Sequence, residues 1–269
     1  MLVEEERNIQ ELPANLQALL AGGSWQTISS GESGDQVFRI VRPGGSACYL
    51  KVADSPWRQE ELLAEKEHLN WLQGYLPVPE VLAFGTDSRR AFLLLSEIPG
   101  LESCNETFAG DIPTVVRLLA EGLRLIHRVK IDDCPFDSGL AHTIAQAKRR
   151  VEARLVDESD FDEQRKGMQA QKLLERLVKS RPEVEDVVFT HGDYCLPNIL
   201  IEPSPARIAG FIDWGRAGIA DHYQDLALAA RSLTFNFGPG WEPLLWEAYG
   251  LQTVDSEKIE FYQLLDEFF

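Results

Sequence analysis

The alternation of apolar and polar residues predicts a β-sheet in the N-terminal part of the chain. Strand-like stretches occupy 25–30, 36–42, 47–53, 79–86 and 90–98. Residues 12–21 predict a short helix that stops at Gly22 and Gly23, and residues 57–75 have the periodicity of a longer helix. We therefore expect an antiparallel sheet with one helix inserted after its third strand.

The rest of the chain is predicted to be mainly helical. It follows the segment 97–100, in which Pro99 and Gly100 interrupt the pattern. Helical periodicity covers 111–129, 141–155, 168–180, 221–235, 241–249 and 255–267, and two strand-like runs lie at 186–190 and 199–213. We therefore predict an α+β fold with a small N-terminal lobe over 1–97, a larger C-terminal lobe over 98–269 and a cleft between them.

Composition and charge narrow the classes of partner. The 269 residues carry a net charge of -17, which disfavours nucleic acid and anionic membranes and favours cationic partners. No apolar run approaches the roughly 20 residues of a membrane helix. The chain begins with acidic rather than basic residues, and its four cysteines are far apart. We expect a cytoplasmic protein with free thiols, without membrane or nucleic-acid partners, that is a monomer or a weak homodimer.

The stretch 190–200 carries the most informative chemistry. Asp193 is followed five residues later by Asn198, on a loop between two short apolar runs, and Asp213 ends the apolar run 208–212. Phosphoryl transfer needs a carboxylate that accepts the proton of the attacking hydroxyl and oxygen ligands that hold Mg²⁺ on the phosphates. The three residues follow one another in the order found in kinases, where a catalytic-loop aspartate and asparagine precede a metal-binding aspartate. We therefore predict Asp193 as the catalytic base and Asn198 and Asp213 as metal ligands.

A lysine for the phosphates is predicted on the strand 47–53. Alternation places Tyr49 and Lys51 on one face of this strand, so that an aromatic surface for a base lies beside a cation. Glu65 falls within the apolar stripe of the helix 57–75, where a carboxylate is costly unless a cation meets it. We therefore predict a Lys51–Glu65 ion pair. A further phosphate contact is predicted from Ser33, between two glycines.

Several sequence runs resemble those of aminoglycoside 3'-phosphotransferases. They are THGDYCLPNI at 190–199, GFIDWGR at 210–216, ADHYQD at 220–225 and LLDEFF at 264–269, and the likeness continues through 134–137 and 151–163. The resemblance implies a protein-kinase-like fold, with ATP, or alternatively GTP, and Mg²⁺ as cofactors. It also implies that adenine stacks near Tyr49 and contacts the hinge around Ser96 and Ile98, and that Arg216 lies near the sugar and phosphate site.

The predicted substrate is a cationic aminoglycoside, and the expected acceptors are acidic. Asp160, Asp162 and Glu163 lie in an insert between two helices, Asp266 and Glu267 lie in the last helical turn, and the chain ends at the carboxylate of Phe269. Carboxylates at a helix C-terminus oppose the helix dipole, so a cationic ligand would offset their cost. Arg231 is a further predicted substrate contact. Just after the equivalent of this arginine, related enzymes carry acidic residues, whereas this chain has Ser232 and Phe235.

Other residues near these motifs have structural interpretations. We expect His191 to brace the catalytic loop, Asp225 to tie its helix to that loop, and His127 to pack in the core. Cys195 is not expected to act as a nucleophile.

Alternative functions differ in substrate or in the absence of chemistry. A kinase of choline, homoserine or a macrolide would share the first catalytic motif, but the C-terminal carboxylates do not favour it. A pseudokinase would be expected to lack at least one of Lys51, Asp193, Asn198 and Asp213, all of which are present.

Overall fold

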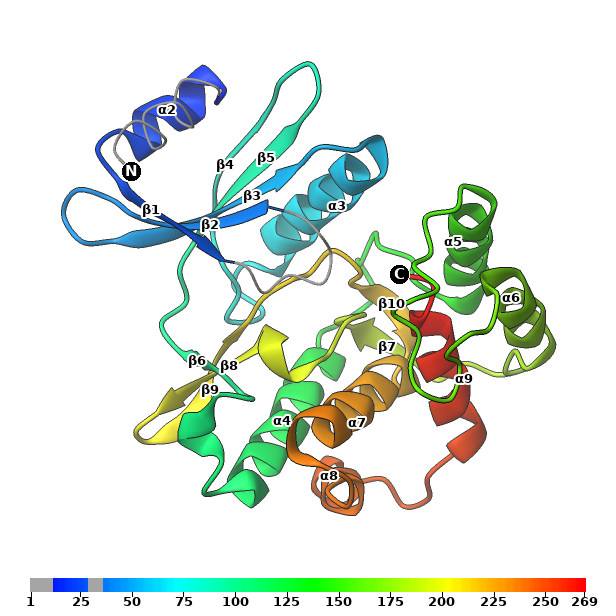
Figure 1. Cartoon of the computed structure of the whole chain (residues 1–269). Helices are drawn as coiled ribbons and strands as arrows, with labels where there is room; N and C mark the ends of the chain where they lie inside the picture. Colours follow the sequence, from blue (N-terminus) through cyan, green and yellow to red (C-terminus); the bar gives the residue numbers. More distant parts are fainter. Residues whose placement is uncertain (1–11, 29–35) are drawn as a thin grey trace. The chain divides into compact units, whose positions relative to one another are not determined.

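The chain folds into two compact units, each described here by itself. The computed structural model describes residues 12–28 and 36–269 (Figure 1). The first unit comprises the described residues up to Gly100 together with Ala209–Arg216, and the second comprises Leu101–Ile208 and Ala217–Phe269. The sequence-based division assigned all of 98–269 to one lobe, whereas the chain returns to the first unit at 209–216.

The first unit is a five-stranded antiparallel sheet with two helices among its described residues. The strand order is β1-β2-β3-β5-β4. The elements are α2 (Ala14–Leu20), β1 (Ser24–Ile28), β2 (Gln36–Val41), β3 (Ala47–Ala53), α3 (Pro56–Leu72), β4 (Val81–Thr86) and β5 (Ala91–Ser96). The predicted antiparallel sheet with a helix after its third strand is confirmed, with differences of a few residues at the element ends.

The two faces of β3 have different surroundings. Cys48, Leu50 and Val52 belong to a buried apolar cluster that includes residues of α2, as the alternation of the strand predicted. Lys51 and Tyr49 therefore point to the opposite face. The helix α3 begins at Pro56, after Ser55 whose hydroxyl accepts a hydrogen bond from the amide of Arg58.

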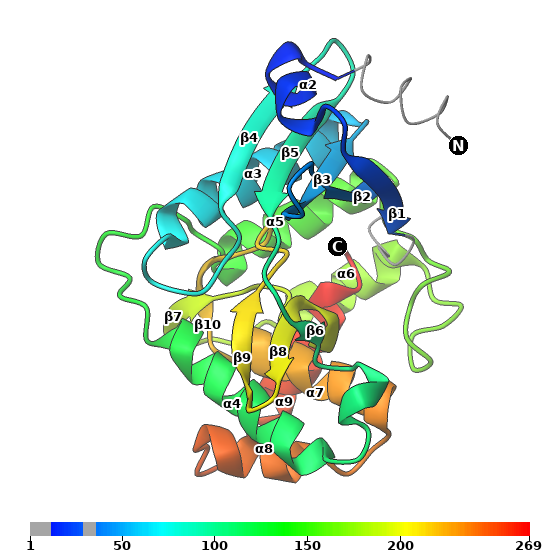
Figure 2. The same cartoon turned by 90° about the vertical axis from the view of Figure 1, so that its left-hand side faces the viewer.

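The second unit contains most of the helices and two small sheets. Its elements are β6 (Leu101–Glu102), η1 (Glu106–Phe108), α4 (Ile112–His127), α5 (Leu140–Glu152), α6 (Ala170–Lys179), β7 (Val187–Thr190), η2 (Leu196–Asn198), β8 (Ile199–Pro203), β10 (Gly218–Asp221), α7 (Tyr223–Phe237), α8 (Glu242–Tyr249) and α9 (Ser256–Asp266). β9 (Ala206–Phe211) starts in this unit and ends in the first. β7 pairs with β10, and β8 lies between β6 and β9 (Figure 2).

Two sequence-based assignments in this unit are wrong in detail. The run 199–213 was expected to be one strand, but a turn at Ser204 and Pro205 divides it into β8 and β9. Residue 221 was expected to start a helix, but Asp221 ends β10, and its carboxylate accepts a hydrogen bond from the amide of Tyr223, where α7 begins. The short strands β6 and β10 were not predicted, because two to four residues carry too little periodicity.

Candidate active site

Lys51 and Glu65 form a buried ion pair in the first unit. Nζ of Lys51 on β3 lies 2.7 Å from Oε1 and 2.9 Å from Oε2 of Glu65 on α3. The Glu65 side chain is only 5% exposed. Burial raises the pKa of Glu65, and the positive charge of Lys51 opposes that shift without cancelling it. The predicted pair is confirmed, because the buried carboxylate is met by a cation.

Asp213 brings a second carboxylate to the same lysine. Its Oδ1 contacts Nζ of Lys51. Burial alone would lower the pKa of Lys51, but the negative charges of Asp213 and Glu65 outweigh burial and raise it. The backbone of Asp213 has a φ of 63°, a left-handed conformation that is uncommon for residues other than glycine. Backbone of this kind concentrates at functional sites.

The segment that carries Asp213 is fastened to the first unit by its neighbours. The amide of Phe211 donates a hydrogen bond of 3.0 Å to the carbonyl of Pro77. The carbonyl of Trp214 lies 2.6 Å from Nδ1 of His68, which is buried on α3. The same helix thus supports both Glu65 and the segment around Asp213, which explains why Lys51 meets two carboxylates.

The predicted nucleotide contacts Tyr49 and Ser96 also lie in the first unit. Tyr49 is half-buried and shares the sheet face of Lys51. Ser96 ends β5, and its hydroxyl accepts a hydrogen bond of 2.8 Å from the amide of Glu80. Ser33 lies outside the described residues.

Ile98 lies beside the returning segment 209–216, and Arg216 ends it. Gly210 fits closely beside Ile98, since a Cβ added to this glycine would lie 2.7 Å from Cδ1 of Ile98. Arg216 is the last residue of the segment and is half-buried. The structure thus brings both predicted residues into the unit that holds Lys51.

Asp193 and Asn198 lie on the loop between β7 and β8, in the second unit. Nδ2 of Asn198 donates hydrogen bonds of 3.0 Å to the backbone oxygen and to Oδ2 of Asp193. The side-chain nitrogen Nδ2 of Asn198 is therefore hydrogen-bonded to Asp193. The side-chain oxygen Oδ1 is the atom that suits a cation. The two residues predicted as base and metal ligand are held together by direct contact.

A buried carboxylate on α7 holds this loop in shape. Oδ2 of Asp225 accepts a hydrogen bond of 2.8 Å from the amide of His191, and Oδ1 accepts one of 2.9 Å from the amide of Gly192. Nδ1 of His191 in turn accepts from the amide of Asp193 at 3.3 Å. The expected roles of His191 and Asp225 in bracing the loop are confirmed.

His127 packs in the core as expected, with its side chain 5% exposed, but both of its ring nitrogens also have polar partners that were not predicted. Its Nε2 lies 3.1 Å from Oδ2 of Asp225, and its Nδ1 lies 2.8 Å from the hydroxyl of Tyr249. Burial would raise the pKa of Asp225, but its interactions with His127 and His191 outweigh burial and lower it. The signal that was missed is general: a buried histidine needs polar partners.

The carboxylates at the end of α9 have partners within the chain. Arg231 contacts Oδ2 of Asp266, and its Nη1 lies 3.7 Å from Oε1 of Glu267. Nη1 of Arg165, a residue that the sequence did not single out, lies 3.2 Å from the same Oε1. The sequence suggested that a cationic ligand offsets the charges of Asp266 and Glu267. The structure corrects this expectation, because two arginines of the chain already offset part of these charges.

The carboxylate of Glu267 has a raised pKa. Burial and the negative charge of Asp162 raise its pKa to about 7, against the opposing effects of Arg165 and Arg231. Burial would lower the pKa of Arg231, but Asp266, Glu267 and Asp193 raise it. The negative charge of Asp193 thus reaches Arg231, which relates the loop of the predicted base to the end of α9.

The predicted substrate contacts in the acidic insert 153–169 differ in their exposure to solvent. Asp160 and Glu163 are exposed, and Glu163 pairs with Lys166 at 2.8 Å. Asp162 is partly buried, and its amide donates a hydrogen bond to Oε2 of Glu267 at 3.2 Å.

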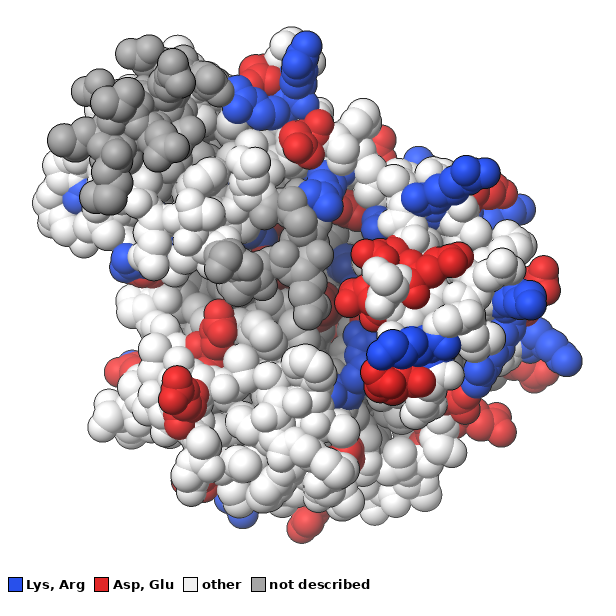
Figure 3. All heavy atoms as spheres, viewed as in Figure 1, with Lys and Arg blue, Asp and Glu red and all other residues white. Residues whose placement is uncertain are grey.

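Acidic and basic side chains lie side by side on the face around α5 and α6 (Figure 3). At the C-terminus, the ring of Phe269 lies under the guanidinium of Arg150 on α5.

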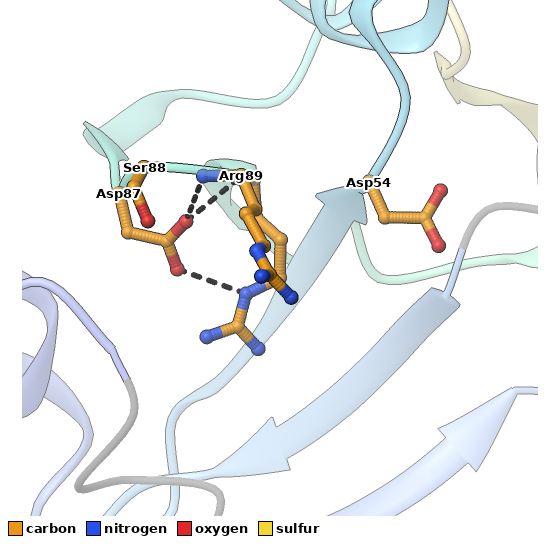
Figure 4. Close-up of a pocket in the computed structure, with 5 residues that line it drawn as sticks. Asp54, Asp87, Ser88 and Arg89 are labelled. Atoms are coloured by element: carbon orange, nitrogen blue, oxygen red, sulfur yellow. Dashed lines mark hydrogen bonds and ion pairs between the residues drawn. The ribbon is translucent and has the colours of Figure 1, made fainter.

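A hollow of about 430 Å³ in the first unit does not coincide with the predicted residues. It lies at the turn between β4 and β5 and is lined by Asp54, Asp87, Ser88, Arg89 and Arg90 (Figure 4). Asp87 fastens this turn by accepting hydrogen bonds from the amides of Arg89 and Arg90. These bonds account for the shape of the turn, and the hollow is not part of the candidate site.

The predicted convergence of Asp193, Asn198 and Asp213 stays a prediction, because Asp213 belongs to the first unit and the other two to the second. Within 12–28 and 36–269, no group of three or more His, Cys, Asp or Glu side chains is arranged to hold a metal. A magnesium ion at a kinase site, however, takes only one or two protein carboxylates and completes its shell with phosphate oxygens and water. The side chains of Asn198 and Asp213 each carry an oxygen of the type that this ion prefers, and their joint role as its ligands stays a prediction.

Comparisons with known proteins identify the family. A model of the phosphotransferase enzyme family matches residues 24–262. The aminoglycoside 3'-phosphotransferase of Niallia circulans is 40% identical over 258 residues, which are 96% of this chain and 97% of that protein. The crystal structure of an aminoglycoside-3'-phosphotransferase of type VIII has a TM-score of 0.87 at 38% identity and covers 95% of this chain and 98% of that one.

The chain belongs to the aminoglycoside phosphotransferase family.

Membership of the aminoglycoside phosphotransferase family confirms the predicted α+β, protein-kinase-like fold. Another member, APH(3'')-Id from Streptomyces rimosus, was solved in complex with ADP and streptomycin; its TM-score is 0.79 at 27% identity, with 94% of this chain and 95% of that one covered. In the described part of this aminoglycoside phosphotransferase, the helices are too short or too polar to span a bilayer.

Proposed function

We propose that this protein transfers the γ-phosphoryl group of ATP to a hydroxyl of an aminoglycoside, the 3'-hydroxyl of kanamycin- or neomycin-type compounds, and so confers antibiotic resistance. The observation that carries the proposal is the contact of Lys51 with the buried carboxylate of Glu65 and with the carboxylate of Asp213. Kinases use such a lysine–glutamate ion pair to place the lysine on the nucleotide phosphates, and an aspartate to hold Mg²⁺ there. The identity of 40% to an aminoglycoside 3'-phosphotransferase over nearly the whole chain supports the substrate class.

The first unit would bind the nucleotide. Lys51 would neutralise phosphate oxygens, and its raised pKa keeps it charged. Tyr49 would stack on the base, with Ser96 and Ile98 at its edge and Ser33 over the phosphates. GTP remains an alternative to ATP, since nothing in these residue types excludes guanine.

The second unit would supply the base and the substrate acceptors. Asp193 would accept the proton of the substrate hydroxyl as its oxygen forms a bond to the γ-phosphorus and the bond to the β–γ bridging oxygen breaks, releasing ADP. Mg²⁺, when held by Asn198 and Asp213, would neutralise charge on the phosphates. Arg216 and Arg231 would lie near the substrate. The residues proposed to contact the substrate and its ammonium groups are Asp160, Asp162, Glu163, Asp266, Glu267 and Phe269.

The proposal is tested by measuring ADP release with purified protein, ATP and Mg²⁺ against kanamycin, neomycin, streptomycin, choline, homoserine and erythromycin. We expect turnover with kanamycin and neomycin, and a phosphate on the 3'-oxygen of the product by NMR. Turnover confined to streptomycin would replace the 3'-assignment by the substrate named for the Streptomyces rimosus structure. Turnover confined to choline, homoserine or erythromycin, or no turnover at all, would overturn the proposal.

Two variants of the same loop separate chemistry from folding. Asp193→Ala should lower kcat by roughly 10²–10⁴-fold, the usual contribution of a general base, while ADP binding by calorimetry changes little. Cys195→Ala, two residues away, should keep kcat within about twofold because the thiol has no part in the proposed chemistry. Near-normal turnover of the Asp193→Ala protein would remove the base from the mechanism.

A further inference from the structure

Arg165 is a charged side chain that is almost completely buried. It lies in the acidic insert, and only 2% of its side chain is exposed, whereas Asp160 and Glu163 of the same insert are exposed. A buried guanidinium is costly unless carboxylates pair with it. Arg165 has two such partners, one local and one distant in the sequence: its Nη1 contacts Oδ2 of Asp162, three residues away, and lies 3.2 Å from Oε1 of Glu267, 102 residues away.

The insert and the end of α9 are joined at both oxygens of Glu267. Arg165 approaches Oε1, and the amide of Asp162 donates to Oε2 at 3.2 Å. Asp162 in turn accepts hydrogen bonds from the amides of Gln164 and Arg165, at 3.0 and 3.1 Å, so the turn of the insert is built around its carboxylate. Arg165 and Asp162 therefore act together as a clamp on Glu267.

We infer that Arg165 is a positioning residue of the aminoglycoside site: it clamps the insert to the end of α9 and so fixes the positions of Asp162 and Glu267, two of the carboxylates proposed to accept substrate ammonium groups. The inference rests on the proposed function. Arg165 itself is buried and acts through its two carboxylate partners. Without it, Asp162 and Glu267 face each other as like charges, and the insert loses its attachment.

The test compares Arg165→Met with a matched arginine variant. Arg176 on α6 also pairs with a carboxylate of α9, Glu260, but its side chain is 45% exposed. For Arg165→Met we expect the KM for kanamycin to rise by roughly tenfold or more, while the KM for ATP and kcat stay within about twofold, because ground-state binding of one substrate is lost. Arg165→Lys, which keeps the charge, should recover part of the affinity, and Arg176→Met should leave both KM values unchanged.

A second variant keeps the inference testable if Arg165→Met fails to fold. Asp162→Asn combined with Arg165→Met removes one charge of each sign, so no buried guanidinium or carboxylate is left alone in the insert. The inference expects this folded protein to show the raised KM for kanamycin as well. An unchanged KM in either folded variant, or an equal rise in the KM for ATP, would overturn the inference alone. A wild-type protein without aminoglycoside turnover would overturn the proposed function and this inference with it.

Discussion

His127 and Asp225 are in direct contact, with Nε2 of the imidazole 3.1 Å from Oδ2 of the carboxylate. The contact joins α4 to α7, and the same carboxylate accepts hydrogen bonds from the amides of His191 and Gly192. The buried carboxylate of Asp225 therefore fixes the backbone just before Asp193.

Replacing Asp225 by Asn should weaken both the fold and the activity. An amide has one oxygen where the carboxylate has two, so one of the buried amides of His191 and Gly192 would lose its acceptor. We expect the free energy of unfolding to fall by about 2–4 kcal/mol and kcat to fall by roughly tenfold or more. Chemical denaturation and ADP release measure the two effects. Asp186→Asn, at a side chain that is 80% exposed, is the control and should change neither.

Replacing Lys51 by Met should destabilise the first unit as well as abolish turnover. Glu65 would remain buried without its cation, which costs about 3–5 kcal/mol. In the double variant Lys51→Met with Glu65→Gln the buried charge is gone, so we expect stability to return while turnover stays absent. Lys66→Met is a control on the same helix, since Lys66 pairs with the exposed Glu67. Loss of activity with unchanged stability in the single variant would show that the pair is not buried as described.

The pKa of Glu267 predicts how stability depends on pH. It is raised from 4.5 to about 7 in the folded protein. The folded state therefore holds this proton more tightly than the unfolded state, and the contribution to stability is present below pH 4.5 and is lost as the pH rises through 7. The full shift corresponds to about 3 kcal/mol. Denaturation at pH 5 and pH 8 should show a drop in wild-type stability that is smaller in Glu267→Gln. Equal drops in the two proteins would contradict the shift.

Gly210 should not tolerate a side chain. A Cβ there would lie 2.6 Å from the carbonyl of Pro77 and 2.7 Å from Cδ1 of Ile98, and the carbonyl cannot move aside cheaply. We expect Gly210→Ala to cost about 1–3 kcal/mol of unfolding free energy. Gly110→Ala is the matched control, because a Cβ at Gly110 meets nothing within 4 Å. Comparable stabilities of the two variants would disprove the close approach.

Sequence patterns predicted contacts that depend on one strand and one helix. Lys51 and Glu65 were paired because strand alternation and a helical stripe each fixed the direction of one side chain, and those two elements follow each other along the chain. Their pairing could be predicted because strand alternation and helical periodicity are both local rules. The bracing of the loop by Asp225 was also expected, although no such pair of local rules supported it.

Contacts between distant segments could not be predicted. Arg165 and Glu267 are 102 residues apart, and nothing local to either residue indicates the other. The sequence presented Glu267 as an acceptor for a ligand, and only the folded chain shows the arginines that share it. The division of 199–213 was missed for a different reason: its signal is local, because Ser204 and Pro205 interrupt the apolar residues where the turn lies, and this signal was overlooked.

The return of 209–216 to the first unit means that this unit is not encoded by one continuous stretch of the gene. A fragment that ends at Gly100 would lack Asp213, the hydrogen bond from Phe211 to Pro77, and the carbonyl that meets His68. Exchange of the N-terminal half between relatives by a single recombination event would therefore join a lysine from one parent to an aspartate from the other. Chimeras with a second crossover on each side of 209–216 would keep the two residues from the same ancestor.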